Sequence, residues 1–255
     1  MLPSFFISHG APTQALAEDV TTACWRSLFQ SLPAVRAVLV MSAHWPTRQP
    51  VLGSSVQPQL IYDFYGFPPP LYQLQWTAQG DPLLAQALVE SLQRQGIPAQ
   101  SQERDLDHGI WVPLRTALVG KSWPVIPLSV QPQQDAAWHY RLGQALAAWR
   151  QQGVLIIGSG GATHNLAALD WQAKDETVQP DTLAFEAWLA DFADMADPVG
   201  MLDELPRLPA FTSQHPTAEH LWPFFFAAGA GGQGRRIHQR VQMGSLSLSA
   251  WRFGD

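Results

Sequence analysis

Short apolar, strand-like runs alternate with amphipathic helical segments along most of this chain. Residues typical of buried parallel strands fill positions 4–7 and 37–41, a further buried strand is predicted at 154–157, and another strand is predicted at 125–130. Helices are predicted over residues 20–32, 83–94, 112–119, 135–152, 181–195 and 218–228. This order predicts an α/β fold: a single-domain three-layer sandwich with a central, mostly parallel sheet flanked by helices. Residues 237–243 and 246–253 are expected to add a terminal pair of strands.

Local signals predict where several elements begin or deviate from regular geometry. Asp81 and Pro82 are typical of a helix N-cap followed by proline in the first turn, and Asp181 is the expected N-cap of a later helix. Pro127 indicates an edge position or an irregularity in its strand. Pro223 is expected to kink the helix that contains it.

The segment from Tyr62 to Pro70 is aromatic and proline-rich, and its sequence is not that of a helix. Two interpretations are open for it. It is either a rigid loop that covers a site or a packed surface loop.

Composition excludes several classes of protein. Of the 255 residues, 46% are apolar and only 14% are charged, so the chain can bury a large core. The net charge of −6, without a basic cluster, argues against nucleic-acid binding. No signal peptide and no membrane-spanning run is recognisable. The single cysteine, Cys24, fits a reducing compartment, and we expect a cytoplasmic protein with no nucleic-acid or membrane partner.

Histidines follow several of the predicted strands. His9, His44 and His164 each come just after a buried strand and beside small or turn residues, whereas His108 follows a polar stretch. The carboxyl ends of parallel strands form the crevice of an α/β sheet, so histidines delivered there can converge on a metal. Each histidine taken singly is equally well a hydrogen-bonded loop residue.

The remaining histidines have less distinctive positions. His215 and His220 lie five residues apart near a predicted helix start, so at most one of them is expected to contact a metal directly. His139 and His238 are expected to be structural. The HExxH, CxxC and GxSxG motifs are all absent, and the Gly158–Gly161 turn matches neither phosphate-binding pattern.

Several short motifs stand in a fixed order along the chain. The motifs are Phe5 to Pro12 (FFISHGAP), Met41 to Trp45 (MSAHW), Leu106 to Leu114 (LDHGIWVPL), Gly158 to Leu166 (GSGGATHNL), His215 to Leu221 (HPTAEHL) and Met243 to Ser247 (MGSLS). Together they resemble the class III extradiol ring-cleaving dioxygenases, in the branch that includes plant DOPA 4,5-dioxygenase and its bacterial relatives. The resemblance covers nearly the whole chain and implies one catalytic domain over residues 1–255.

The resemblance also implies site residues and a cofactor. His9, His44 and His220 match the metal ligands, and His164 matches a histidine that acts as acid/base or as a further ligand. His108 matches an active-site histidine that contacts substrate or oxygen. The expected metal is iron(II), with zinc as an alternative in the isolated protein. In the wider superfamily the third ligand is a glutamate, and here His220, next to Glu219, takes that place.

The implied reaction inserts both atoms of O2 into a catechol-type substrate and opens the ring next to the diol, giving a muconic semialdehyde. The partners are then a small aromatic diol and O2. Two alternatives remain open from the residues: a zinc-dependent hydrolase, and a non-enzymatic binding protein of the MEMO type. Neither the particular catechol nor the oligomeric state follows from the sequence.

Overall fold

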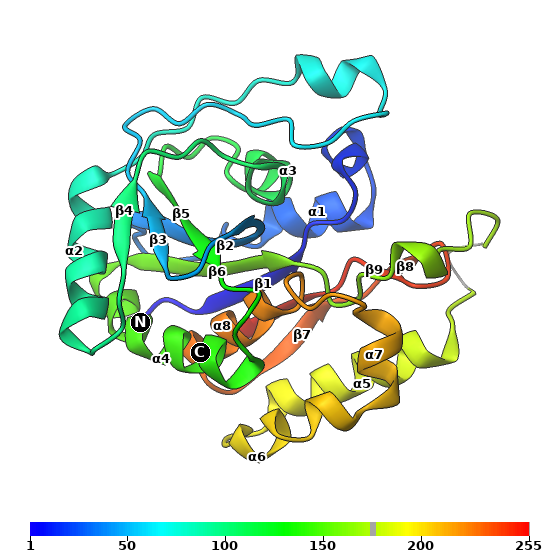
Figure 1. Cartoon of the computed structure of the whole chain (residues 1–255). Coiled ribbons are helices and arrows are strands. Elements are labelled where there is room, and N and C mark those ends of the chain that lie inside the picture. The colour runs from blue at the N-terminus through cyan, green and yellow to red at the C-terminus, as the bar shows by residue number, and fades with distance from the viewer. Residues whose placement is uncertain (174–176, 255) are drawn as a thin grey trace.

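A computed structural model describes residues 1–173 and 177–254 and contains one large sheet between two layers of helices (Figure 1). Its strands are β1 Ser4–Ser8, β2 Ala37–Pro46, β3 Val51–Gly53, β4 Gln100–Gln102, β5 Val125–Val130, β6 Val154–Gly160, β7 Gly234–His238 and β10 Ala250–Phe253. A second, two-stranded sheet is formed by β8 Val241–Gln242 and β9 Leu246–Ser247.

The helices fall into two groups by geometry. The α-helices are α1 Val20–Ser27, α2 Pro82–Arg94, α3 His108–Ala117, α4 Ala136–Leu146, α5 Pro180–Asp194, α6 Val199–Leu202, α7 Pro209–Gln214 and α8 Trp222–Gly231. The 3₁₀-helices are η1 Pro12–Leu16, η2 Pro69–Gln73, η3 Ala147–Gln152, η4 Leu166–Ala168 and η5 Leu205–Arg207.

The large sheet has a parallel centre and antiparallel additions. Its strand order is β4-β3-β5-β2-β6-β1-β10-β7. The four central strands β5, β2, β6 and β1 are mutually parallel, whereas β3 joins β5 and β10 joins β1 in the antiparallel direction. The predicted fold class is confirmed, with a mixed rather than a uniformly parallel sheet.

Successive side chains of the central strands point to opposite faces of the sheet and so pack into two separate cores. In β1, Phe5 and Ile7 face one core, which is closed by α1 and α3, while Phe6 faces the other. The second core lies under α2, α4, α5 and α8, and Figure 1 shows α8 and α4 on the opposite side of the sheet from α3 and α1. Both faces are therefore covered, as expected for apolar strands of a parallel centre.

Several predicted element ends were wrong. Helix α1 ends at Ser27, five residues early, whereas α3 begins at His108, four residues before the predicted start. Asp81 does cap α2, accepting from the Leu84 amide, but α5 begins after Gln179 with Pro180 in its first turn, so Asp181 is not the cap. The predicted helix 135–152 is α4 followed by η3.

The edge position offered for Pro127 and the kink expected at Pro223 are both wrong. Pro127 lies in β5, which is internal to the sheet; its neighbour β3 pairs with β5 only through Leu52 and Leu128, so no ladder hydrogen bond is required from the proline. Pro223 lies in the first turn of α8, where a missing amide hydrogen removes no helical bond, and so it causes no kink. The predicted terminal strand pair is divided between β7–β10 and β8–β9.

Helices α4 and α8 cross closely at Gly143. A Cβ there would lie 2.1 Å from the backbone carbonyl oxygen of Phe226.

Helix propensity alone would favour alanine at Gly143 by about 1 kcal/mol. Because the clash involves backbone, we expect Gly143→Ala to lower the free energy of unfolding by about 2 kcal/mol or more in urea titrations. The control is Gly200→Ala in α6, where a Cβ meets nothing within 4 Å; equal effects of the two changes would contradict this packing.

Candidate metal centre

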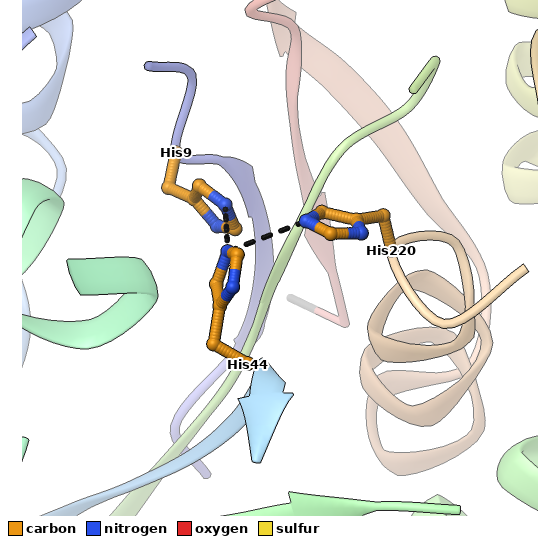
Figure 2. A group of neighbouring side chains, drawn as sticks. All are labelled: His9, His44 and His220. Atoms are coloured by element: carbon orange, nitrogen blue, oxygen red, sulfur yellow. Dashed lines mark hydrogen bonds between the residues drawn. The ribbon is translucent and has the colours of Figure 1, made fainter. Parts of the chain in front are cut away.

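Three histidines from distant parts of the chain meet at the carboxyl edge of the sheet. His9 directly follows β1, His44 lies near the end of β2, and His220 lies in the turn before α8. Strand β6 separates β1 from β2 and runs parallel to both, so their carboxyl ends share one edge. Figure 2 shows the three imidazole rings directed toward one another.

The nitrogen atoms of these rings are close enough to share one ion. The His44 Nε2 atom lies 3.0 Å from His9 Nε2 and 3.3 Å from His220 Nε2. The ligand atoms of all three lie within 4.8 Å of one another. Two nitrogens bound 2.0–2.1 Å from one ion at angles near 90–109° would be about 2.8–3.4 Å apart. The spacing therefore fits a single divalent cation.

Hydrogen bonds on the far side of the His9 and His220 rings explain why their Nε2 atoms face inward as lone pairs. The Ser159 hydroxyl donates to the Gly109 carbonyl, so its oxygen accepts from His9 Nδ1–H, 3.1 Å away. Glu219 Oε1 accepts from His220 Nδ1–H at 2.9 Å. Partners of this kind fix the tautomer with Nε2 unprotonated, which is the form that binds a metal.

Burial keeps the three imidazoles uncharged. Desolvation, followed by repulsion from His108, lowers the pKa of His44 to about 3. Desolvation is also the main reason that the pKa values of His9 and His220 lie well below their usual range, and neighbouring histidines add to the effect. A neutral trio is ready to receive a cation without first losing protons.

Close backbone packing positions His220. Strand β6 ends at Gly160, where a Cβ would lie 2.0 Å from the carbonyl oxygen of His220. The amide of Gly161 donates to that same oxygen at 2.9 Å. The small residues after β6 therefore allow the turn before α8 to lie directly against the sheet edge.

His164 lies beside the three-nitrogen group. Its ring stacks on that of His220 with centroids 3.4 Å apart and planes 7° from parallel. Among the described residues, His164 shares a potential ligand group with Glu219 and His220, and not with His9 and His44. Burial lowers its pKa, against the opposing effect of Glu219, so the ring is neutral at pH 7.

His108 is held by a carboxylate that sequence reasoning did not identify. Asp63 Oδ1 accepts from both the backbone amide and Nδ1–H of His108, each at 2.9 Å. Its other oxygen lies 3.8 Å from His44 Nδ1. Burial raises the pKa of Asp63, but the hydrogen bonds that it accepts from His108 outweigh this and lower the pKa below its usual value. The ionised Asp63 carboxylate thus hydrogen-bonds to His108 and lies close to His44.

The other histidines lie away from the centre. His215 is buried and its Nε2 donates to the Ala162 carbonyl oxygen at 2.9 Å. His139 stacks on Trp222, and His238 hydrogen-bonds to Thr21. Trp45, Trp111 and Trp222 are buried.

A cavity of about 480 Å³ opens above the histidines. His9, His44, His108, His164 and His220 line its floor. Phe64 and Phe67 line its wall, so the predicted loop from Tyr62 to Pro70 does cover the site. The end of that loop forms the start of the 3₁₀-helix η2 at Pro69, which sequence reasoning had excluded from any helix.

Ser159, Asp63 and the orienting role of Glu219 were missed from the sequence. Glu219 was visible as the neighbour of His220, and Asp63 lay within the recognised aromatic loop. Ser159 had no signal beyond its place in a glycine turn. All three act by contacts that depend on the folded chain.

The chain is similar over nearly its full length to known enzymes. A family model described as the catalytic LigB subunit of aromatic ring-opening dioxygenase matches residues 3–253. The 4,5-DOPA dioxygenase extradiol of Beta vulgaris is 37% identical, covering 98% of this chain and 96% of its own. The 4,5-DOPA dioxygenase extradiol of Escherichia coli K12 is 32% identical, with 99% of this chain and 95% of that protein covered. A solved structure of an uncharacterized Escherichia coli K12 protein has a TM-score of 0.82 and 29% identity, with 100% of both chains covered.

The fold, the histidine centre and these similarities define the class of the protein. The chain belongs to the LigB family of aromatic ring-opening dioxygenases. It is an oxidoreductase of the extradiol type, and the family is metal-dependent. The resemblance seen in the ordered motifs is confirmed. Within residues 1–173 and 177–254, no helix has the length and apolar character needed to cross a lipid bilayer.

Asp107 links the strand that carries His44 to the helix that begins at His108. Its Oδ1 accepts from the Ser42 hydroxyl at 2.5 Å, and that hydroxyl accepts from the His44 amide at 3.2 Å. The other carboxylate oxygen is buried without a hydrogen bond among the described residues. Desolvation raises the pKa of Asp107 to about 6.

This raised pKa predicts a specific pH dependence of stability. The native state holds the Asp107 proton up to about pH 6, whereas the unfolded chain loses it near pH 4, so stability falls as pH rises through this window. The fall should approach about 3 kcal/mol. Asp107→Asn should remove this step in urea titrations from pH 4 to 7. A constant difference between wild type and variant across this range would contradict it.

Proposed function

We propose that this enzyme inserts both atoms of O2 into a catechol-type substrate, opening the ring next to the diol to give a muconic semialdehyde. The observation that carries the proposal is the convergence of three neutral Nε2 atoms, from His9, His44 and His220, on the floor of an aromatic-walled cavity. Family membership supports the reaction class, and the named relatives are extradiol enzymes.

The proposed metal ligands are His9, His44 and His220. Iron(II) is the metal that we propose for activity because, when bound, it would supply a Lewis acid for the diol oxygens and redox chemistry for dioxygen. Three neutral imidazoles leave the full double positive charge of the ion in place, which favours a deprotonated diol. Zinc fits the same nitrogens but is redox-inert, so zinc-loaded protein should bind a diol without opening it.

His164 is the proposed acid and base. It is neutral at pH 7 because burial lowers its pKa, and it lies in the cavity beside His220. It can therefore accept the proton that a diol loses on binding and return it as the ring opens. Among the described residues, His164 does not belong to the ligand group of His9, His44 and His220, which supports this role over that of a further ligand to the same ion.

His108 is the proposed contact to substrate or dioxygen. Asp63 accepts its Nδ1–H, so Nε2 is left as an acceptor on a ring that lines the cavity. The ring of His108 also packs 3.9 Å from that of His44, centroid to centroid. Any group bound beside His44 would thus lie within reach of His108.

Two wider proposals complete the assignment. We propose that residues 1–255 act as one catalytic domain, supported by the family match over residues 3–253. We also propose a cytoplasmic location, supported by the free thiol of Cys24. The partners would be a small aromatic diol and O2.

The function is tested by loading the protein anaerobically with iron(II) and adding air and a panel of catechols. We expect oxygen uptake together with a yellow semialdehyde from at least one catechol, and neither with zinc-loaded protein. Absence of uptake with stoichiometric iron would contradict the proposal. Ester or amide hydrolysis by the zinc form without oxygen would instead indicate a hydrolase.

Replacing His164 tests its proton-transfer role. His164→Ala should retain iron in elemental analysis but lose turnover by about 10²-fold or more, because general acid–base catalysis typically contributes that much. The matched control is His238→Ala, whose ring bonds to Thr21 away from the cavity and whose loss should leave turnover unchanged. Full turnover of His164→Ala would exclude the role.

A further inference from the structure

The cavity above the histidines has two chemically different parts. Its floor is formed by imidazole rings, whereas its sides are formed by large apolar side chains: Phe64, Phe67, Leu166, Leu169, Trp171 and Leu246. A diol held at the floor would therefore present its ring and any ring substituent to apolar groups.

Two of these side chains are unusually exposed. Leu166 is 60% exposed and Trp171 is 76% exposed, and both lie at the cavity rather than on a remote surface. When an apolar ligand covers large apolar side chains that face water around a binding site, the burial of both surfaces makes the free energy of binding more favourable. The rim is thus suited to a ligand whose outer end is apolar.

Of the three hydroxyl side chains among the described residues that line the cavity, Thr163 and Ser247 make internal hydrogen bonds and Thr13 is exposed. The Thr163 hydroxyl donates to the Ser245 carbonyl oxygen at 2.5 Å and accepts from the Ser247 amide at 2.8 Å. The Ser247 hydroxyl donates to the buried Glu186 carboxylate. Neither hydroxyl is therefore free to solvate a charged substituent.

Charged substituents would meet an unfavourable environment here. Among the described residues that line the cavity, none is a lysine, arginine, aspartate or glutamate. A carboxylate or ammonium group moved from water to such a wall loses hydration without gaining an ionic partner. The relatives named 4,5-DOPA dioxygenase carry the name of an amino acid, a zwitterionic catechol.

We infer that the substrate of this enzyme is a catechol with an uncharged, apolar ring substituent, and not an amino-acid catechol such as DOPA. The inference rests on the proposed function, since it takes the diol to be bound at His9, His44 and His220. It adds that Leu166, Leu169 and Trp171 select the substituent.

Binding to zinc-loaded protein tests the inference without turnover. Calorimetric titrations would compare catechol, 4-propylcatechol and DOPA. We expect 4-propylcatechol to bind more tightly than catechol by up to about fourfold for each buried methylene, and DOPA to bind no more tightly than catechol. Tighter binding of DOPA than of 4-propylcatechol would overturn the inference.

Turnover by iron-loaded protein distinguishes failure of the substrate inference from failure of the proposed ring-opening function. The same order in kcat/KM is expected, with 4-propylcatechol above catechol and DOPA. Opening of DOPA in preference to 4-propylcatechol would overturn the inference alone, because the ring-opening function would then be established. Opening of no catechol would overturn both.

A charge placed on the rim tests which residues select the substituent. Leu166→Arg should weaken 4-propylcatechol binding and strengthen binding of 3-(3,4-dihydroxyphenyl)propionate by up to about fivefold, the range of an exposed ion pair. The control is Leu83→Arg on α2, where Leu83 is 85% exposed and does not line the cavity. Equal affinities in the two variants for both ligands would overturn the role of the rim.

Discussion

Three imidazole rings that face one another, with His44 Nε2 lying 3.0 Å from His9 Nε2 and 3.3 Å from His220 Nε2, are the constraint on which the rest of the site depends. Nitrogen lone pairs at such distances repel one another, so the rings must be held from behind until a cation lies between them. Ser159 and Glu219 provide hydrogen bonds from behind, and burial removes the competing protonated forms. The fold thus builds a neutral, preorganised set of donors before any metal arrives.

The same design extends outward from the centre. Asp63 holds His108 with two hydrogen bonds, and Asp107 and Ser42 connect the start of α3 to the strand of His44. His164 stacks on His220, which places the proposed proton acceptor directly beside one proposed ligand. Around this polar floor the cavity wall is apolar, which separates the position of the chemistry from the position of substrate selection.

Much of the fold was predictable, because buried strands and amphipathic helices depend on local patterns of apolar residues. The central strands and the cap at Asp81 followed those patterns. The errors at α3 and β5 share another cause: each was decided by contacts with distant parts of the chain. Helix α3 begins at His108 because Asp63, 45 residues away, binds the His108 amide. Pro127 is tolerated inside the sheet because β3 scarcely pairs with β5.

By itself the sequence determined the α/β class, the histidines available at strand ends and the family, since these depend on residue type, spacing and order. The ordered motifs implied that His220 joins His9 and His44, and the tertiary structure placed the three rings together while giving His215 a hydrogen bond to the Ala162 carbonyl. Only it paired His9 with Ser159, 150 residues along the chain. The physical reason is that imidazole tautomer and direction depend on the partner of the second ring nitrogen, which chain folding brings there.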